Sequence, residues 1–421
     1  MMFDFLRKLG SIKENPVGRT VVMTPGQPVW SERQFRKLAD EGYARNAVAH
    51  FCIYKISSAI ACVPLRLCRM VNGQMQEIDD HELLRLLEKP NAVQSGDDLI
   101  HALVSFFLIG GNAYLLDVAR KQKELWLLNP ENMQVIADES MVPRAYRFKG
   151  NKGRIDFPVD LMTGESEVMH WKDFHPWNEW YGLSKMEPAA YGVDTLNSVM
   201  AWNKSFLDSA CIPSGVFETK SALTDSQFAR LKEQIGKSYS GAKNAGKPLL
   251  LDNEITWKPI SVSPKDTKFL ENYHVVARQV ASLFGVPAQM LGIPGDSTYN
   301  NMAEARLIFW EDTVIPLMDK MINKLNNWLT PQFGDDLHLY YKEEDIRALE
   351  PRRAEMHKRL TEASWMTRNE KRRATGYDDL AEDFIDLPLT SVPIDANGNL
   401  VEDIRGARAE SDPEEPEEAE E

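Results

Sequence analysis

The sequence predicts an α+β fold, in which strands and helices are mixed before the chain becomes mostly helical. Residues 45–180 interleave apolar helical stretches with short alternating segments that are typical of strands. Residues 264–329 have the apolar spacing of two helices joined by a polar loop. Hydrophobic and charged contents of 43% and 27% are those of a soluble globular protein, and 421 residues allow two or three domains.

The start of the chain is expected to be a flexible N-terminal arm over residues 1–30, because Pro16 and the run Pro25–Pro28 break regular structure. An alternative is that its short amphipathic beginning docks on a partner or a neighbouring subunit. It lacks the long apolar core of a signal peptide. The most apolar stretch, residues 99–119, spans only ~20 Å in its helical part, too little for a bilayer, so no membrane contact is expected.

Residues 31–180 are predicted to form one mixed unit. Apolar residues three and four positions apart predict its helices, and strict alternation predicts its strands. Asn72-Gly73 is a strong hairpin turn, and Asp79-Asp80-His81 is expected to cap a helix. The expected helices cover 46–61, 81–87 and 95–111, and the expected strands cover 63–69, 112–118, 124–128, 133–136, 146–148 and 168–171.

The next part is predicted to be a helix followed by a small α+β insertion. Ser184 and Glu187 have capping-box spacing, and the helix that they begin should run to about residue 210. The insertion covers 211–263 and is slightly basic, with seven Lys or Arg against five Asp or Glu. Its expected elements are a strand at 215–219, a helix at 225–237 that starts from a Thr224–Gln227 capping box, and strands at 248–251 and 255–262.

The central helix pair begins after Pro264. The first helix should end at Gly285-Val286-Pro287, and the second should run from 301 to 329, capped by Asn300-Asn301 and kinked at Pro316. A polar loop joins them. The first helix has a packed face and a wet face. The packed face carries Phe269, Tyr273, Val276, Ala277, Val280, Leu283 and Phe284, and the wet face carries Lys268, Glu271, Asn272, Val275, Gln279 and Ser282.

The C-terminal part should return one strand and then become helical. The strand is expected at 337–341, a charged helix at 347–363, and a second short helix from a Thr367–Glu370 capping box to Gly376. Residues 386–421 are rich in Pro and Glu and should be a disordered acidic tail. The helices are locally basic, which favours a solvated face. The bases are Arg352, Arg353, Lys358, Arg359, Arg368, Lys371, Arg372 and Arg373.

Charge and cysteine content exclude two classes of protein. The net charge is −14, of which residues 410–421 supply −8, so the rest of the chain carries −6. A mildly acidic body is not built to hold DNA through its phosphates, which argues against a sequence-reading DNA-binding protein. The four cysteines lie outside CxxC pairs and are expected to be reduced, buried thiols rather than zinc ligands. They are Cys52, Cys62, Cys68 and Cys211.

Several short segments of the helix pair resemble one known family. These segments are residues 277–287, 290–292, 297–301, 309–310 and 315–317. In this order they are similar to the portal proteins of tailed bacteriophages, in the short form found in lambda-like long-tailed phages and prophages. The similarity covers about residues 45–380. Pro90-Asn91 and the segments 111–114 and 128–130 also resemble the portal wing.

The resemblance implies a portal-type subunit with named parts. In such a subunit a wing, two stem helices, a clip, a tunnel loop, a long spine helix and a helical crown follow along the chain. Here they would be an α/β wing at 31–180, stem helices at 181–210 and 264–285, a clip at 211–263, a tunnel loop at 286–300, the spine helix with a returning wing strand at 301–345, and crown helices at 346–385.

The resemblance also implies a structural role without enzymatic activity. The chain would form a homo-dodecameric ring at one capsid vertex, in the virion and, during assembly, in the host cytoplasm. Double-stranded DNA would pass through the ring during packaging and ejection, without being read for sequence. The terminase large subunit and the head-tail adaptor proteins would dock on the clip, and the major capsid and scaffold proteins would surround the ring.

Three sets of residues would carry this role. The tunnel loop would place short polar groups and one negative charge at the narrowest point, and the wet face of the second stem helix would line the lumen. The tunnel-loop residues are Asp296, Ser297, Thr298, Tyr299 and Asn300; the lumen residues are Lys268, Glu271, Asn272 and Gln279; and the clip residues for docking are Lys220, Arg230, Lys232, Lys237, Lys243 and Lys247. The basic crown could alternatively meet packaged DNA.

Two alternatives to a portal remain open. Gly241–Lys247 fits the spacing G-x-x-x-x-G-K, which would suit a nucleotide-dependent DNA-packaging motor subunit. However, a phosphate loop needs Ser or Thr and then a helix, whereas Pro248 and an apolar strand follow here, so a glycine-rich turn is favoured. The other alternative is a monomeric adaptor that binds a partner through the acidic tail.

Other motifs do not form a catalytic or metal site. His170 and His175 near Asp173 have no further ligand within reach by sequence, and a surface turn rich in Trp is the favoured interpretation. Ser184 and Ser214 lack the context of a nucleophile elbow. We therefore expect no enzyme activity, no cofactor and no metal.

Overall fold

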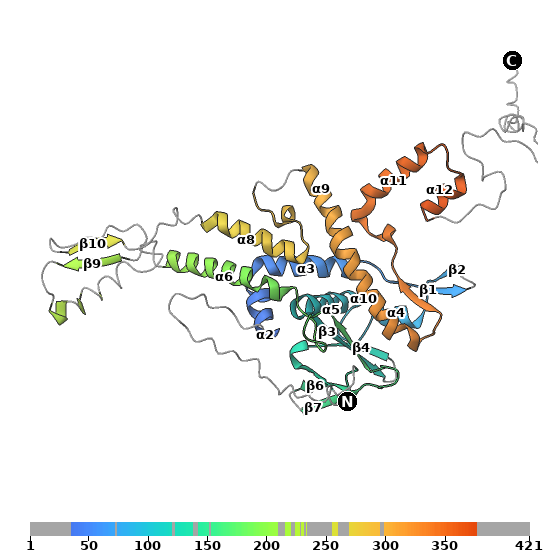
Figure 1. Ribbon diagram of the computed structural model, residues 1–421, viewed down its shortest axis with the longest axis horizontal. Helices are drawn as coiled ribbons and strands as arrows, with labels where there is room; N and C mark the ends of the chain where they lie inside the picture. The colour runs from blue at the N-terminus through green and yellow to red at the C-terminus, as the bar shows by residue number, and fades with distance from the viewer. Residues whose placement is uncertain are drawn as a thin grey trace, which may run out of the picture. The chain divides into compact units, whose positions relative to one another are not determined.

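The computed structural model describes residues 35–376 with gaps, and its mixture of helices and antiparallel sheets agrees with the predicted α+β class (Figure 1). The gaps are 72–73, 120–122, 138–141, 151–152, 209–214, 220–223, 228, 231–232, 234–254, 260–268 and 295–298. The expected N-terminal arm and acidic tail lie outside the described residues. The chain divides into two compact units, the first ending at Asp345 and the second beginning at Ile346.

Two packed helices form the centre of the first unit. After α2 (Phe35–Lys37) and the π-helical η1 (Leu38–Ala44), Asn46 caps α3 (Ala47–Ala61) by accepting from the amides of Val48 and Ala49. α5 (Gly96–Gly110) packs on α3 and begins at a capping box between Ser95 and Asp98. Between them, His81 caps α4 (Glu82–Glu88), as predicted.

Three small antiparallel sheets surround these helices. The first has the order β11-β1-β2 and joins distant segments: β1 (Arg66–Val71), β2 (Gln74–Ile78) and β11 (Leu337–Tyr340). The second has the order β4-β3-β8: β3 (Asn112–Ala119), β4 (Lys123–Leu128) and β8 (Val168–Lys172). The third has the order β5-β6-β7 and follows η2 (Pro130–Asn132): β5 (Met133–Ile136), β6 (Ala145–Gly150) and β7 (Gly153–Pro158).

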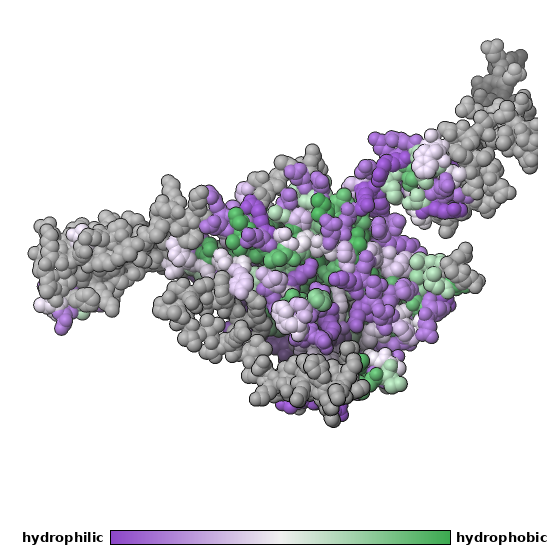
Figure 2. All heavy atoms as spheres, in the orientation of Figure 1, coloured by the Kyte–Doolittle hydropathy of each residue, from purple (hydrophilic) through white to green (hydrophobic). Residues whose placement is uncertain are grey.

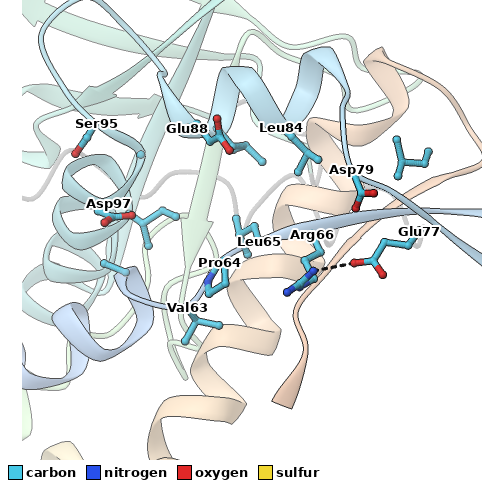
Figure 3. A pocket seen from close by; sticks show the side chains of 15 residues that line it. Val63, Pro64, Leu65, Arg66, Glu77, Asp79, Leu84, Glu88, Ser95 and Asp97 are labelled. Atoms are coloured by element: carbon cyan, nitrogen blue, oxygen red, sulfur yellow. Dashed lines mark hydrogen bonds and ion pairs between the residues drawn. The ribbon is translucent and has the colours of Figure 1, made fainter. Parts of the chain in front are cut away.

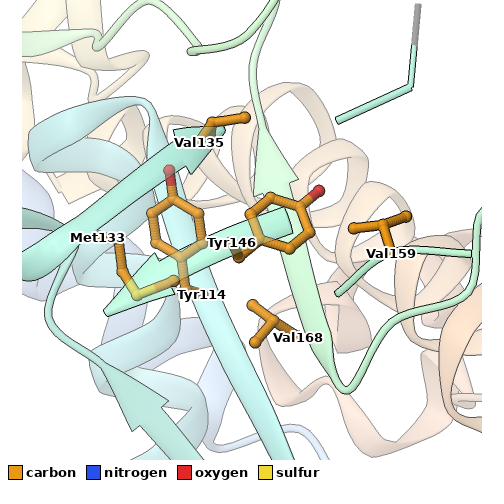
Figure 4. Close-up of a cluster of buried hydrophobic side chains, with 6 residues drawn as sticks. All are labelled: Tyr114, Met133, Val135, Tyr146, Val159 and Val168. Carbon is orange, nitrogen blue, oxygen red and sulfur yellow. The ribbon is translucent and has the colours of Figure 1, made fainter. Parts of the chain in front are cut away.

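An aromatic and aliphatic cluster joins the second and third sheets. The ring of Tyr114 on β3 lies against β5 and β6, edge to face with Tyr146 (Figure 4). Met133, Val135 and Val168 are also buried there. β7 was not predicted; its alternation of Ile155, Phe157 and Val159 is short, and most residues of the strand are exposed.

After β8 the first unit continues mainly as helices (Figure 1). α6 (Met186–Asp208) lies beside α8 (Phe269–Phe284), and β9 (Gly215–Thr219) pairs with β10 (Ile255–Pro259) in the segment between them. After the 3-10 turn η4 (Ala288–Leu291), helix continues through α9 (Tyr299–Ile308), the π-helical η5 (Phe309–Val314) and α10 (Ile315–Trp328). The 3-10 turns η6 (Thr330–Gln332) and η7 (Glu343–Asp345) flank β11.

The second unit begins with η8 (Arg347–Leu349), which leads into α11 (Glu350–Glu362). α12 (Arg368–Ala374) follows, and the predicted Thr367–Glu370 capping box is confirmed: Thr367 Oγ1 accepts from the Glu370 amide at 3.1 Å. Both helices agree with the predicted segments.

Several predictions about single residues were wrong. Ser184 forms no capping box with Glu187: its buried hydroxyl accepts from the amide of Met186, the first residue of α6, and donates to the carbonyl oxygens at the end of α5. Asn300 does not precede the spine helix but lies within it, since α9 begins at Tyr299. Cys62 is exposed, unlike the buried Cys52 and Cys68. Within the described residues, every helix is too short or too polar to cross a membrane.

Candidate functional site

The candidate site is built on α8, whose packed face is fixed by α6 and α3. Ala277, Val280 and Phe284 are buried against these helices. Gly192 on α6 allows the close approach, because a Cβ at that position would lie 2.8 Å from Val280 Cγ2. With this face occupied, the opposite face of α8 is left on the surface of the subunit.

The open face of α8 carries most of the predicted lumen residues. Glu271, Asn272 and Gln279 are exposed, and so is Ser282. Val275, expected on the wet face, is 50% exposed, whereas Leu283, expected on the packed face, is 46% exposed. Lys268 lies outside the described residues. Among the exposed residues just named, Glu271 alone is charged, and the half-buried Arg278 lies two turns further along the same side of the helix, so this part of the surface is polar and carries few charges.

The base of the predicted tunnel loop is hydrogen-bonded to the predicted spine helix. Gly285 ends α8 with φ +78°, a conformation that costs glycine little, and its carbonyl oxygen accepts from Thr313 Oγ1 at 2.7 Å. A Cβ at Gly285 would collide with Thr313 Oγ1. The amide of the buried Val286 donates to the carbonyl oxygen of Ala281 at 2.9 Å. The chain therefore leaves α8 in one defined direction.

The rest of the loop is partly ordered by backbone turns. η4 is a 3-10 turn, Gly292 follows with φ +70°, and Ile293 is buried. Asp296, Ser297 and Thr298 lie outside the described residues, and Tyr299 and Asn300 belong to the first turn of α9. The tip of the tunnel loop thus stays a prediction, while its base is defined.

The spine helix contains a feature that the sequence reading missed. Residues Phe309–Val314 form π-helical turns, with Phe309, Thr313 and Val314 buried. We expected an irregularity at Pro316, and the π-helical turns lie directly before it, over the residues whose hydrogen-bond ladder a proline inside a continuous helix interrupts. A possible signal was Thr313 itself, a polar residue in an apolar row. The π-helical turns bring it to Gly285.

The predicted clip residues are largely outside the described part of the chain. Arg230 is exposed on a short helical segment. The other predicted docking residues, Lys220, Lys232, Lys237, Lys243 and Lys247, fall in the gaps, as does the Gly241–Lys247 motif. The described strands β9 and β10 confirm that this segment contains an antiparallel strand pair.

A pocket of about 490 Å³ lies between β1, β2, α4 and α5, and its chemistry does not suit a nucleotide (Figure 3). The Arg66 guanidinium is already paired, at 2.9 Å to Asp345 and 2.9 Å to Glu77. These bonds raise the pKa of Arg66 and keep it charged. The remaining charged groups around the pocket are the carboxylates of Asp79, Glu88 and Asp97, which would repel phosphate.

The two histidines lie in different surroundings. His170 is buried, with Nε2 at 3.0 Å from Asn112 Oδ1, and burial lowers its pKa to about 3, so it is neutral. Trp171 is buried and stacked on Phe107, whereas Trp177 is 80% exposed beside His175. Across the described segments no group of His, Cys, Asp and Glu has the arrangement of a metal site.

Comparisons with known proteins agree with the resemblance seen in the sequence. The family model described as "Phage portal protein" matches residues 47–376. An uncharacterized protein of Rickettsia bellii strain RML369-C is 35% identical over 340 residues, which cover 80% of this chain and 88% of that protein. The portal protein of Enterobacteria phage HK97 is 24% identical over 351 residues, 79% of either chain.

A solved structure gives the same result. A chain from the neck of a native gene transfer agent particle, computed with C12 symmetry, is 34% identical, with a TM-score of 0.64, and the match covers 84% of this chain and 96% of that chain. Together these matches support a portal or connector role in a ring-forming oligomer of a virion-like particle, and a structural rather than enzymatic protein. The chain belongs to the phage portal protein family.

Proposed function

We propose that twelve copies of this chain form a ring at one vertex of a capsid, and that double-stranded DNA passes through the ring during packaging and ejection. The observation that supports this most directly is the nearly neutral open face of α8, next to a loop whose base is fixed. A surface that must let a polyanion slide should offer few cations, because each phosphate contact adds to affinity and to salt dependence.

The lumen in this proposal is lined by Lys268, Glu271, Asn272 and Gln279, in which the charge of Lys268, outside the described residues, offsets that of Glu271. Amide groups form and exchange hydrogen bonds with water and phosphate without a net charge, so no position along the DNA is favoured strongly. The tunnel loop, held at Gly285 by Thr313, would form the narrowest point. Its tip, with Asp296 as its one charge, would repel rather than hold the backbone.

The clip would be the docking surface for the packaging motor and later for the neck. Arg230 is exposed there, and the segment 211–263 is slightly basic in an otherwise acidic chain, which suits an acidic partner. In this proposal the terminase large subunit docks first and the head-tail adaptor proteins replace it, while major capsid and scaffold proteins hold the ring at its vertex.

The oligomeric state is measured first. Light scattering after size exclusion, with particle images of the peak, should give a closed ring of about twelve chains of 47.9 kDa each. If only smaller species form, the capsid and scaffold proteins are added as nucleators. A chain that forms no ring under either condition would contradict the proposal.

The lumen position is then tested by adding charge. Asn272→Lys with Gln279→Lys adds two cations per subunit to the open face of α8, and Asp296→Lys adds one at the loop tip. Each should slow packaging and reduce ejection, because DNA would bind instead of sliding. Gln76→Lys, at an exposed position on β2, is the matched control. Unchanged packaging rate and DNA length in both lumen variants would rule out a lumen position for this face.

A further inference from the structure

The second compact unit combines two basic helices with the most acidic part of the chain. Residues 346–376 contain nine Lys or Arg and four Asp or Glu, a net charge of +5. Residues 377–421 contain sixteen Asp or Glu and two Arg, a net charge of −14. That value equals the charge of the whole protein, so the first 376 residues are neutral overall. The strongest charge asymmetry of the molecule therefore lies within one unit.

Three bases of these helices lie on an open surface. α11 has no buried residue, and Asn369 is the one buried residue of α12. Figure 2 shows both helices as mostly hydrophilic surface. The bases Lys358, Arg359 and Arg368 are all exposed. A helix that is polar on every side gains little from packing and is suited to ionic contacts with a partner.

One cation on α12 needs an acceptor. Lys371 Nζ is buried from solvent and has no hydrogen-bond partner among the described atoms. An enclosed ammonium without an acceptor is costly, and a carboxylate is the group that would lower this cost most. Like the net charge of these helices, the Lys371 ammonium points to a ligand that is rich in carboxylates.

We propose that the acidic C-terminal segment 402–421 binds α11 and α12 of its own chain and occupies them as a polyanion would. The connection, residues 377–401, is 25 residues long. Twenty-five residues can span at most about 85 Å, so segment 402–421 is attached within reach of both helices. Because both partners belong to one chain, a contact between these carboxylates and the exposed Lys358, Arg359 and Arg368 is intramolecular and can form even when its intrinsic affinity is weak.

The consequence concerns DNA and rests on the proposed function. Basic helices on a portal ring would otherwise hold DNA through its phosphates. An attached segment of carboxylates competes for the same cations and keeps them from retaining DNA that has to move. The contact itself does not depend on ring formation, so the two proposals can fail separately.

The contact is tested directly on the full-length protein. A carbodiimide joins carboxylates to amines that touch them, so cross-links should form between Lys358 and glutamates of 410–421, and they should disappear between about 50 mM and about 500 mM salt. Exposed Lys55, Lys89 and Lys149 serve as internal controls and should give few such links. Links to Lys358 that are no more frequent than links to the controls would overturn the proposal.

The competition is tested with a DNA duplex of random sequence. Replacing the seven glutamates of residues 410–421 by glutamine should tighten duplex binding at low salt by about tenfold or more. Adding Lys358→Glu, Arg359→Glu and Arg368→Glu should remove that gain, whereas Lys55→Glu, Lys89→Glu and Lys149→Glu should not. An unchanged affinity in the glutamine variant, or a gain that survives the α11–α12 substitutions, would show that the segment does not occupy these helices.

Discussion

The helices α5 and α8 are of similar length and yet end up in different environments. Nine of the fifteen residues of α5 are buried; a capping box closes its start, and Asn112 ties its end to the chain before α6. α8 buries one stripe and leaves Val275 and Leu283 about half exposed. The difference indicates that α5 is completed within its own subunit, whereas α8 has a surface that remains for a neighbour or for the lumen.

The largest effect is expected from Asn112→Ala, at the well-packed end of this comparison. Asn112 is buried, donates to the carbonyl oxygens of Gly110 and Gly182, and accepts from the Gly182 amide and His170 Nε2. Removing it leaves these buried groups without partners, at a cost of about 3–5 kcal/mol. Urea unfolding at fixed oligomeric state measures this free energy.

The control for this prediction is Asn129→Ala. Asn129 is exposed, and its side-chain oxygen accepts from the Glu131 amide at 3.0 Å at the start of η2. Losing such a cap costs about 1 kcal/mol. Equal effects of the two substitutions would mean that the Asn112 network does not hold α5, β8 and the chain before α6 together.

The next effect separates the base of the tunnel loop from its middle. Gly285 and Gly292 both have positive φ, but a Cβ at Gly285 would strike Thr313, while no atom of the described residues lies within 4 Å of one at Gly292. Gly285→Ala should cost about 2–4 kcal/mol, and Gly292→Ala about 1–2 kcal/mol from backbone strain alone. Unfolding free energies measure both.

The same pair also sharpens the functional comparison. Because Gly285 sets the direction in which the loop leaves α8, Gly285→Ala should reduce DNA packaging in particles that still contain a ring, and Gly292→Ala should reduce it less. A packaging defect that is equal in both variants would indicate that loop direction does not matter for DNA passage.

Acid should weaken the well-packed region before it affects the exposed helices. His170 has a pKa of about 3 in the folded protein, lowered by burial and by Lys172 and Lys324, against 6.5 for an ordinary histidine. Below pH 6.5 the unfolded chain binds a proton that the folded chain does not. The free energy of unfolding therefore decreases as the pH is lowered, by about 1.4 kcal/mol per pH unit down to about pH 3.

This pH effect is measured between pH 6.5 and 5, above the range in which ordinary carboxyl groups titrate. Unfolding free energies should fall by about 2 kcal/mol over that window. His170→Gln, which keeps a donor for Asn112 and has no titration, should flatten the slope. A slope that is the same in the variant would place the sensitivity at another group.

The sequence predicted the fold where local signals and packing agree. Asn46, Ser95 and Thr367 are caps whose side chains and following apolar residues indicate the same helix start, and each helix begins there. Ser184 shows the limit of this reasoning. Its spacing to Glu187 is that of a capping box, but the end of α5, distant in sequence, provides carbonyl oxygens that its hydroxyl binds instead.

The candidate site was predicted in composition rather than in geometry. The polar face of α8 follows from the helical period, so Glu271, Asn272 and Gln279 were found. The bond from Thr313 to Gly285 was not, because it depends on π-helical turns that shift the register of the spine helix. Leu283 was wrongly placed on the packed face, because the helical period of α8 does not show where the neighbouring helices end.

The smallest effect on stability is expected from Leu283→Gln. This variant decides whether the open surface of α8 contacts a neighbouring subunit or the lumen. Leu283 is 46% exposed, so the subunit should lose less than about 0.5 kcal/mol of unfolding free energy. If α8 is completed by a neighbouring copy, the same change removes apolar area from every interface of the ring and should reduce ring yield severalfold, measured by light scattering. Met162→Gln, at a residue that is 95% exposed, is the control and should leave ring yield unchanged. A normal ring yield for Leu283→Gln would assign this side chain to the lumen instead, so that both faces of α8 would be explained without a neighbour.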